Sequence, residues 1–207
     1  TVILNSAYWG QCDSIYTTFI ILTLLYLYRE KYHRAFMFLG IAFAFKMQTI
    51  FIFPFIICFY IYKKQFSIFE LLITVFTFWI SGIGAFVQGR SLLDPFRIYA
   101  NQTGTYQYMH VNFPSFWMFV GNDYEWLKTA AIVMAAGICG MGLYIIMKRK
   151  LDCSRPENFV SIASWFIWTC VLFLPAMHER YAYPLEILLV ILTCINKDYL
   201  KYSSVAI

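Results

Sequence analysis

The chain has 207 residues, of which 61% are hydrophobic, 21% are aromatic and only 13% are charged. Soluble domains carry about 25% charged residues, and a soluble core of this size could not hide so much apolar surface. The net charge of +5 does not indicate a nucleic-acid partner. Because the apolar runs are continuous rather than alternating, a transmembrane β-barrel is excluded. We therefore predict an all-α, polytopic bundle of transmembrane helices.

Apolar stretches recur along the whole chain and leave room for about seven membrane segments. The residues from 35 to 62 are too long for one crossing and are interrupted at Lys46, so we expect two compact helices that meet there. The polar residues 88–125 form a segment far longer than an ordinary connection, and we predict a long outer loop. The other spans are expected at about 14–28, 66–87, 126–147, 158–175 and 183–195.

The distribution of basic residues predicts which loops face the cytoplasm. Most lysines and arginines fall in one alternating set of loops, which the positive-inside rule assigns to the cytoplasmic side. The other set holds Lys46, Arg90, Arg97, Lys128 and Arg180. We thus predict a multi-pass integral membrane protein, one membrane domain over residues 1–207, with its active face on the non-cytoplasmic side. The sequence opens at Thr1 without Met or a basic leader, and we expect it to be an excerpt that lacks N-terminal helices.

The six cysteines form no C-x-x-C pair and have no histidine at metal-ligand spacing. Most lie inside apolar runs, where cysteine behaves as a small hydrophobic residue. We expect neither a zinc site nor a disulfide framework. No cofactor and no metal are predicted.

Polar and aromatic residues gather just before the first span. Asp13 or the following serine fits a helix N-cap, and Trp9 fits the aromatic belt of a membrane interface. The alternative is a sugar-binding surface, in which a ring stacks on Trp9 while Gln11 and Asp13 hold hydroxyl groups. Both interpretations stay open on the sequence.

Lys46 and Gln48 interrupt an apolar stretch. A lysine in a span costs roughly 2.5–3.5 kcal/mol unless it is solvated or paired. A snorkelling residue at a helix end would explain it. A hairpin tip that faces an aqueous cavity explains both residues better, and it would make Lys46 available to an anionic group such as a phosphate.

The turn from His178 to Tyr181 joins a proton carrier, a carboxylate and a fixed cation. Charged turns between helices are common, which is the plainer interpretation. Glu186 follows inside the next span, where a carboxylate needs a partner. We expect Asp13, Lys46 and His178 to share one outward-facing cavity and Glu186 to face the interior of the bundle.

Four segments resemble, in order, the polytopic GT-C glycosyltransferases, and most closely the prokaryotic branch related to the second mannosyltransferase of GPI-anchor assembly. They are residues 5–16 (NSAYWGQCDSIY), 43–48 (FAFKMQ, with Pro54 downstream), 112–117 (NFPSFW) and 177–181 (MHERY). The Lys46-Met47-Gln48 and His178-Glu179 elements also resemble the lipid-phosphate-glucose-dependent glucosyltransferases of N-glycan assembly. One feature departs from the family. The usual catalytic carboxylate of the first outer loop would precede Thr1.

The resemblance implies transfer of a sugar, expected to be mannose, from a polyprenyl-phosphate donor to a lipid-linked or surface glycan acceptor. It implies catalytic roles for Asp13, His178 and Glu179 and contacts to the donor phosphate for Lys46 and Arg180. Sugar binding is expected of Trp9, Gln11, Gln48, Asn112 and Tyr181. The expected partners are these two substrates and membrane lipids.

A transporter or flippase of lipid-linked glycans is the alternative from another class, because it too would hold Lys46 and Glu186 within the membrane. Its polar residues should continue through the bilayer to form a path. Here the cytoplasmic halves of the predicted spans are almost wholly apolar, which favours an enzyme site on one side. A scaffold subunit without chemistry would explain the composition but not the clustering of polar residues.

Overall fold

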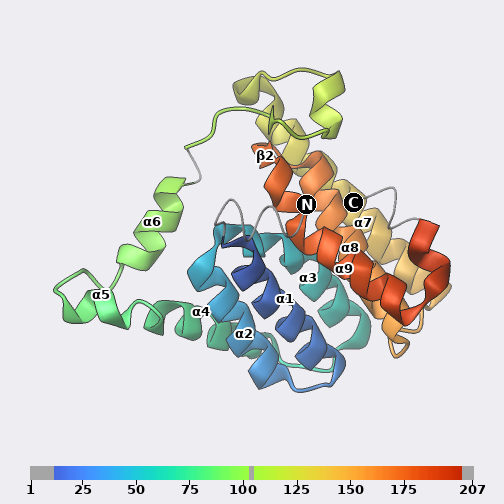
Figure 1. Ribbon diagram of the computed structural model, residues 1–207, viewed down its shortest axis with the longest axis horizontal. Coiled ribbons are helices and arrows are strands. Elements are labelled where there is room, and N and C mark those ends of the chain that lie inside the picture. The colour runs from blue at the N-terminus through green and yellow to red at the C-terminus, as the bar shows by residue number, and fades with distance from the viewer. Residues whose placement is uncertain (1–11, 103–104, 202–207) are drawn as a thin grey trace. The chain divides into compact units, whose positions relative to one another are not determined.

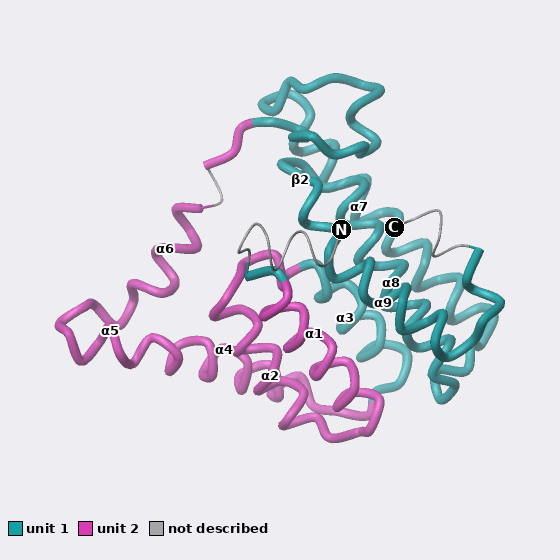
Figure 2. Tube along the Cα trace, in the orientation of Figure 1, with its two compact units in different colours: residues 1–13, 51–64, 108–207 teal, residues 14–50, 65–107 magenta. Residues whose placement is uncertain are grey.

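The computed structural model describes residues 12–102 and 105–201, and its regular structure is almost entirely helical (Figure 1). The predicted all-α class is confirmed. The chain divides into two compact units (Figure 2). Unit 1 comprises residues 1–13, 51–64 and 108–207, and unit 2 comprises residues 14–50 and 65–107.

Unit 2 contains two long helices of the first part of the chain, α1 (Asp13–Tyr28, beginning one residue before the unit) and α2 (Tyr32–Phe45). The helix α2 packs along α4 (Leu71–Ile80), and the Thr74 hydroxyl of α4 donates a hydrogen bond to the Phe36 carbonyl of α2 at 2.9 Å. A glycine permits this close approach. A Cβ atom on Gly40 would lie 2.6 Å from the Thr74 carbonyl oxygen. Phe36 and Gly40, the two residues of α2 that approach α4, are both buried.

Lys46 ends α2 in extended backbone, and the chain continues through the 3₁₀ helix Met47–Ile52 into α3 (Phe53–Lys63). The prediction of two compact helices that meet near Lys46 is therefore confirmed. Pro54 lies in the first turn of α3, where its missing N–H removes no helical hydrogen bond.

The predicted span 66–87 differs from the structure. It consists of the 3₁₀ turn Ile68–Glu70, α4, and the short helix α5 (Ile83–Val87), with a turn at Ser81 and Gly82. A further helix, α6 (Asp94–Gln102), lies within the segment that we predicted as an irregular loop. Its start has an N-terminal signature that the sequence analysis overlooked, an aspartate followed by a proline.

Unit 1 is built on α3, α7 (Tyr124–Arg149), α8 (Pro156–Phe173) and α9 (Tyr183–Ile195), with α8 in contact with the other three (Figure 1). Edge-to-face aromatic pairs join α3 to α8, with ring centroids 5.1 Å apart for Phe55 and Phe159. The helices α7 and α8 approach at Gly142, where an added Cβ would lie 2.2 Å from the Trp165 ring. In the core of unit 1, large aromatic residues therefore pack against one another and against small residues.

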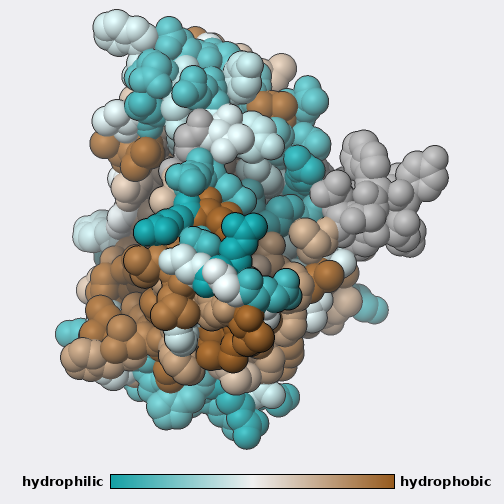
Figure 3. Space-filling model, turned by 90° about the vertical axis from the view of Figure 1, so that its left-hand side faces the viewer, coloured by the Kyte–Doolittle hydropathy of each residue, from teal (hydrophilic) through white to brown (hydrophobic). Residues whose placement is uncertain are grey.

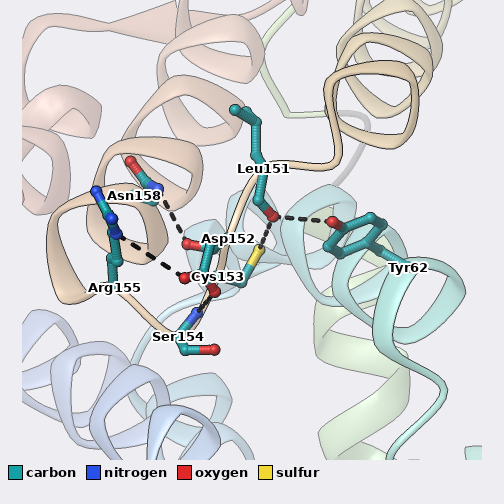
Figure 4. Close-up of polar contacts among 7 residues, drawn as sticks. All are labelled: Tyr62, Leu151, Asp152, Cys153, Ser154, Arg155 and Asn158. Atoms are coloured by element: carbon teal, nitrogen blue, oxygen red, sulfur yellow. Dashed lines mark hydrogen bonds and ion pairs between the residues drawn. The ribbon is translucent and has the colours of Figure 1, made fainter.

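The turn between α7 and α8 is fixed by polar contacts (Figure 4). The Ser154 backbone N–H donates to the Asp152 carboxylate at 2.9 Å, and the Asn158 amide donates to the Asp152 carbonyl at 3.0 Å. Donation by Ser154 to the charged carboxylate lowers the pKa of Asp152 below its usual value. From α3, the Tyr62 hydroxyl donates to the Leu151 carbonyl at 2.9 Å, which ties this turn to the helix core.

Among the described residues, one helix is long and apolar enough to cross a membrane by length and composition. This is α7, with 26 residues and only 22% of its most apolar stretch buried. Four other apolar helices have 10–17 residues, shorter than the roughly 20 that span a bilayer core: Asp13–Tyr28, Tyr32–Phe45, Met47–Lys63 and Ile68–Ile80. The arrangement of about seven membrane segments stays a prediction.

Large apolar side chains are exposed on the described surface. In unit 2, Phe69 is 73% exposed, Leu72 62% and Val87 83%. Figure 3 shows one face, on which broad areas of hydrophobic side chains are bordered by hydrophilic ones. Apolar patches of such extent mark contact with a partner or a lipid phase rather than with water alone.

Candidate functional site

Two of the four motif segments lie side by side in unit 1. The strand β1 (His110–Val111) pairs in parallel with β2 (Met177–His178), in a register that places Val111 beside His178. The Ala176 backbone N–H donates to the Tyr108 carbonyl at 3.0 Å and closes the near end of this pair. The segment 112–117 therefore begins next to the segment 177–181, although residues 118–176 lie between them in the sequence.

The second segment folds into a compact aromatic turn. His178 ends β2 and is 7% exposed, and the 3₁₀ helix Glu179–Ala182 follows it. The Tyr181 ring meets the His178 ring at an angle of 64°, with centroids 5.1 Å apart, and Phe51 packs against the other side of Tyr181. Glu179 is exposed and Arg180 is partly buried. In this turn the His178 imidazole is therefore buried, whereas the Glu179 carboxylate is exposed at the surface.

The backbone is unusual on both sides of the strand pair. Asn112, directly after β1, has φ = +51°, and Ala176, directly before β2, has φ = +60°. Asparagine tolerates this left-handed region, whereas an alanine there costs of order 1 kcal/mol. Asn112 is exposed, so its amide is accessible for the predicted contact to sugar. Its residue type also has a structural explanation in this turn.

Trp117 fixes the first segment to the helix core. It is 4% exposed, and its indole N–H donates to the Phe173 carbonyl at the end of α8 at 2.8 Å. It belongs to a buried cluster with Met109 and Ala131. The ring of Trp117 therefore lies inside the protein rather than along a membrane interface.

The motif before the first span is described only from residue 12 onward. Trp9 and Gln11 lie outside the described residues, so the predicted sugar contacts of these two side chains stay predictions. Asp13 begins α1 and has no exposed surface. A carboxylate in the first turn of a helix is favoured by the helix dipole. Asp13 is the first residue of α1 rather than the residue before it, so its role as N-cap stays a prediction. Its buried position does not by itself support a catalytic role.

Lys46 and Gln48 belong to unit 2, whereas Asp13, His178 and Arg180 belong to unit 1. The Lys46 ammonium lies 5.3 Å from the centre of the Tyr16 ring, and Lys46 and Gln48 are both partly buried. A cation over an aromatic face stabilises a lysine at the end of an apolar helix. That all of these residues share one cavity stays a prediction.

Glu186 lies close to the start of its helix. Because α9 begins at Tyr183, this carboxylate is in the first turn, where it is partly buried. The N-terminus of a helix favours a negative charge. Glu186 also has an interaction partner in the structure, so it is not an isolated charge.

An apolar cavity of about 380 Å³ lies between α3, α7 and α8 in unit 1. Its lining includes Pro54, Ile132, Gly140 and Phe166, and the thiols of Cys58, Cys139 and Cys170 from three different helices. Leu174, three residues before Met177, lines the same cavity and brings it close along the chain to the His178 turn. Such a lining suits a hydrocarbon chain.

A second cavity, of about 600 Å³, lies within unit 2 among α4, α5 and α6. It presents Arg90, Arg97 and Asn101 over a floor that includes Phe78 and Phe86. The sequence predicts these arginines in the non-cytoplasmic loops but indicates no role for them. The feature of the sequence that indicates this site is the pair of arginines, Arg90 and Arg97, on either side of the Asp94-Pro95 helix start.

No protein-family model, no curated protein and no solved structure matches this chain. The resemblance of the four segments to GT-C glycosyltransferases therefore rests on the residues themselves.

Proposed function

We propose that this protein is a multi-pass membrane glycosyltransferase that moves a sugar, mannose by resemblance, from a polyprenyl-phosphate donor to a lipid-linked or glycan acceptor on the non-cytoplasmic face. The observation that carries the proposal is the pairing of β1 with β2 in unit 1. It gathers Asn112, His178, Glu179 and Arg180 into one region of the fold. These residues come from two of the segments that resemble the family.

The chemistry requires few groups. The acceptor hydroxyl oxygen attacks the anomeric carbon while a carboxylate removes its proton, and the bond from that carbon to the phosphate oxygen breaks. The departing lipid phosphate takes the electron pair, and a cation stabilises the charge. Arg180 is the cation of this region, and the exposed Glu179 is an accessible carboxylate. The buried His178 positions the turn and adds a proton donor to the phosphate.

The apolar cavity of unit 1 supports a lipid substrate. A polyprenyl chain needs a hydrocarbon-lined path that leads to the reacting phosphate. The cavity lies between α3, α7 and α8, of which α8 ends at Phe173, shortly before the His178 turn, and its lining is apolar apart from weakly polar thiols. The 26-residue helix α7, which provides one wall, is also the helix best suited to a membrane.

Replacing Arg180 with methionine should weaken binding of a polyprenyl-phosphate sugar. Loss of one charge-assisted contact is worth roughly 1.5–3 kcal/mol, or about one to two decades in affinity. Donor binding and sugar transfer would be measured on the full-length protein in lipid nanodiscs. Asp13→Asn should lower sugar transfer while donor binding stays largely intact. Lys46→Met tests the second predicted contact to the donor phosphate and should weaken donor binding.

Arg149→Met, at the end of α7, is the control for loss of a positive charge, and Asn112→Gly removes the amide where a positive φ is tolerated. Full donor binding in Arg180→Met would remove the phosphate role. If the protein moved an intact lipid-linked glycan across vesicle membranes without transferring its sugar, the function would be that of a transporter and not of a glycosyltransferase.

The unit 1 cavity allows a test with matched glycines. Gly140 lines the cavity and Gly137 does not, yet both are exposed on α7 and a Cβ on either would meet no atom within 4 Å. Leucine at either position should stabilise the helix by up to about 1 kcal/mol relative to glycine. We expect Gly140→Leu to lower transfer from a long-chain donor at least tenfold and Gly137→Leu to leave it unchanged. Equal activity of the two variants would show that no chain occupies this cavity.

A further inference from the structure

The cavity of unit 2 is formed by a folded arm of the chain. After α4, the turn at Ser81 and Gly82 leads into α5, and α6 then returns toward the end of α2. The Tyr99 hydroxyl of α6 donates to the Phe43 carbonyl of α2, and the Trp79 indole of α4 donates to the Leu92 carbonyl at 3.0 Å. These contacts tie the arm to α2 and α4 around the cavity.

Aromatic packing makes the floor of this cavity apolar. The Phe78 ring stacks on Tyr99 with centroids 5.2 Å apart and meets the Phe96 edge at 5.3 Å. Phe86 packs on Trp79 at 5.4 Å. Because these rings are fixed by one another, they offer a surface for hydrocarbon at little cost in side-chain entropy.

Positive charge lines the opening of the cavity. Arg90 follows Gly89, whose φ of +88° turns the chain, and Arg97 lies one helical turn into α6. Asp94 offsets part of this charge, since its carboxylate is 3.7 Å from the Arg97 guanidinium and also accepts from the Ser91 backbone N–H at 3.2 Å. One net positive charge remains, and Asn101 adds an amide donor. Arginine forks bind phosphate oxygens in pairs.

Exposed apolar side chains lie next to the lining residues along the chain. Val87 is 83% exposed, and Leu92 and Leu93 are each 56% exposed. A small hydrophilic anion would not use this surface, because it has no hydrocarbon to place there. The combination of an apolar floor, a cationic opening and exposed apolar side chains next to them along the chain is complementary to an amphiphile with an anionic head.

We propose that the unit 2 cavity is a binding site for a membrane lipid whose phosphate head carries a net negative charge. Arg90, Arg97 and Asn101 contact the phosphate head, and the first part of the hydrocarbon chain lies on Phe78 and Phe86. The remaining chain follows the exposed leucines into the bilayer. The site does not depend on sugar transfer, and it would operate equally in a transporter.

The test uses the full-length protein in phosphatidylcholine nanodiscs and measures binding of fluorescent phosphatidic acid. Arg90→Gln and Arg97→Gln should each weaken binding about tenfold to a hundredfold. Ala85→Phe, which places a ring in the cavity without a change of charge, should weaken it about as much. Inorganic phosphate should not displace the lipid at a hundredfold excess over it.

Arg155→Gln is the matched control. Arg155 pairs with Asp152 three residues before it at 3.9 Å and is 69% exposed, close to the 64% of Arg97, but it lines neither cavity. Its replacement should leave the affinity unchanged. Far-ultraviolet circular dichroism would confirm that each variant is folded. An equal loss in Arg155→Gln, or equal binding of phosphatidylcholine, whose phosphate head has no net charge, would overturn the site as one for a phosphate head of net negative charge. If inorganic phosphate displaced the lipid and Ala85→Phe had no effect, the cavity would be a site for free anions. That result would contradict the proposal of a lipid ligand.

Discussion

Trp117→Ala should destabilise unit 1 by about 3–5 kcal/mol, the range for a large aromatic residue removed from a packed core. The ring is 4% exposed and packs with Met109 and Ala131, and its N–H satisfies the Phe173 carbonyl. Its loss leaves a cavity and an unpaired carbonyl in the same place. Chemical unfolding in mild detergent, followed by circular dichroism, would measure the change.

Two variants separate the causes of this effect. Trp117→Phe keeps most of the ring and removes the hydrogen bond, so it should cost about 1 kcal/mol beyond any change in packing. Trp126→Ala removes a tryptophan that is 83% exposed, and it should change the unfolding free energy by no more than about 0.5 kcal/mol. Equal effects of Trp117→Ala and Trp126→Ala would mean that the outer segment is not packed on α8 as described.

Gly40→Ala should destabilise unit 2 by about 1–3 kcal/mol, although alanine is the better helix former. The added methyl group would lie 2.6 Å from the Thr74 carbonyl oxygen and 2.7 Å from the Thr77 Cβ. A backbone atom cannot rotate away, so α2 and α4 must separate. The separation would stretch the hydrogen bond from Thr74 to Phe36. The expected result is a lower unfolding temperature in detergent.

Gly84→Ala in α5 is the matched change, since a Cβ there would meet no atom within 4 Å. It should leave the unfolding temperature unchanged or raise it slightly. If Gly40→Ala were as stable as Gly84→Ala, the close packing of α2 on α4 would not exist in the folded protein.

The longer helices could be predicted because each has a strong local signal. Continuous apolar residues and a basic end located α7, and Lys46 with the proline after it located the break between α2 and α3. The arm that contains α5 and α6 was harder to predict from the sequence. Ser81 and Gly82 interrupt a run that is apolar enough to read as one span, and the Asp94 start of α6 lies among polar residues. Tertiary contacts of Trp79 and Tyr99 hold this arm, and such contacts have no local periodicity in the sequence.

The candidate site could be predicted in part. His178 was predicted from the residue types of its turn and Asn112 from the resemblance of its segment, and the structure places the two segments together through β1 and β2. The burial of Trp117 could not be inferred, because an aromatic residue near a span suits both an interface and a core. Arg90 and Arg97 were missed as a site because their apolar floor comes from α4 and α5. Only the fold brings charge and rings together.

The parallel strand pair also determines when the site can form. Its partners are residues 110–111 and 177–178, with the whole of α7 and α8 between them. A contact over such a separation carries the entropy of a long closed loop and forms after the local helices. During synthesis, β1 must therefore wait until two helices have been made and docked before β2 reaches it. A chain stopped after α8 would hold both helices but leave the edge of β1 unpaired and the His178 turn unmade, a state open to quality-control factors.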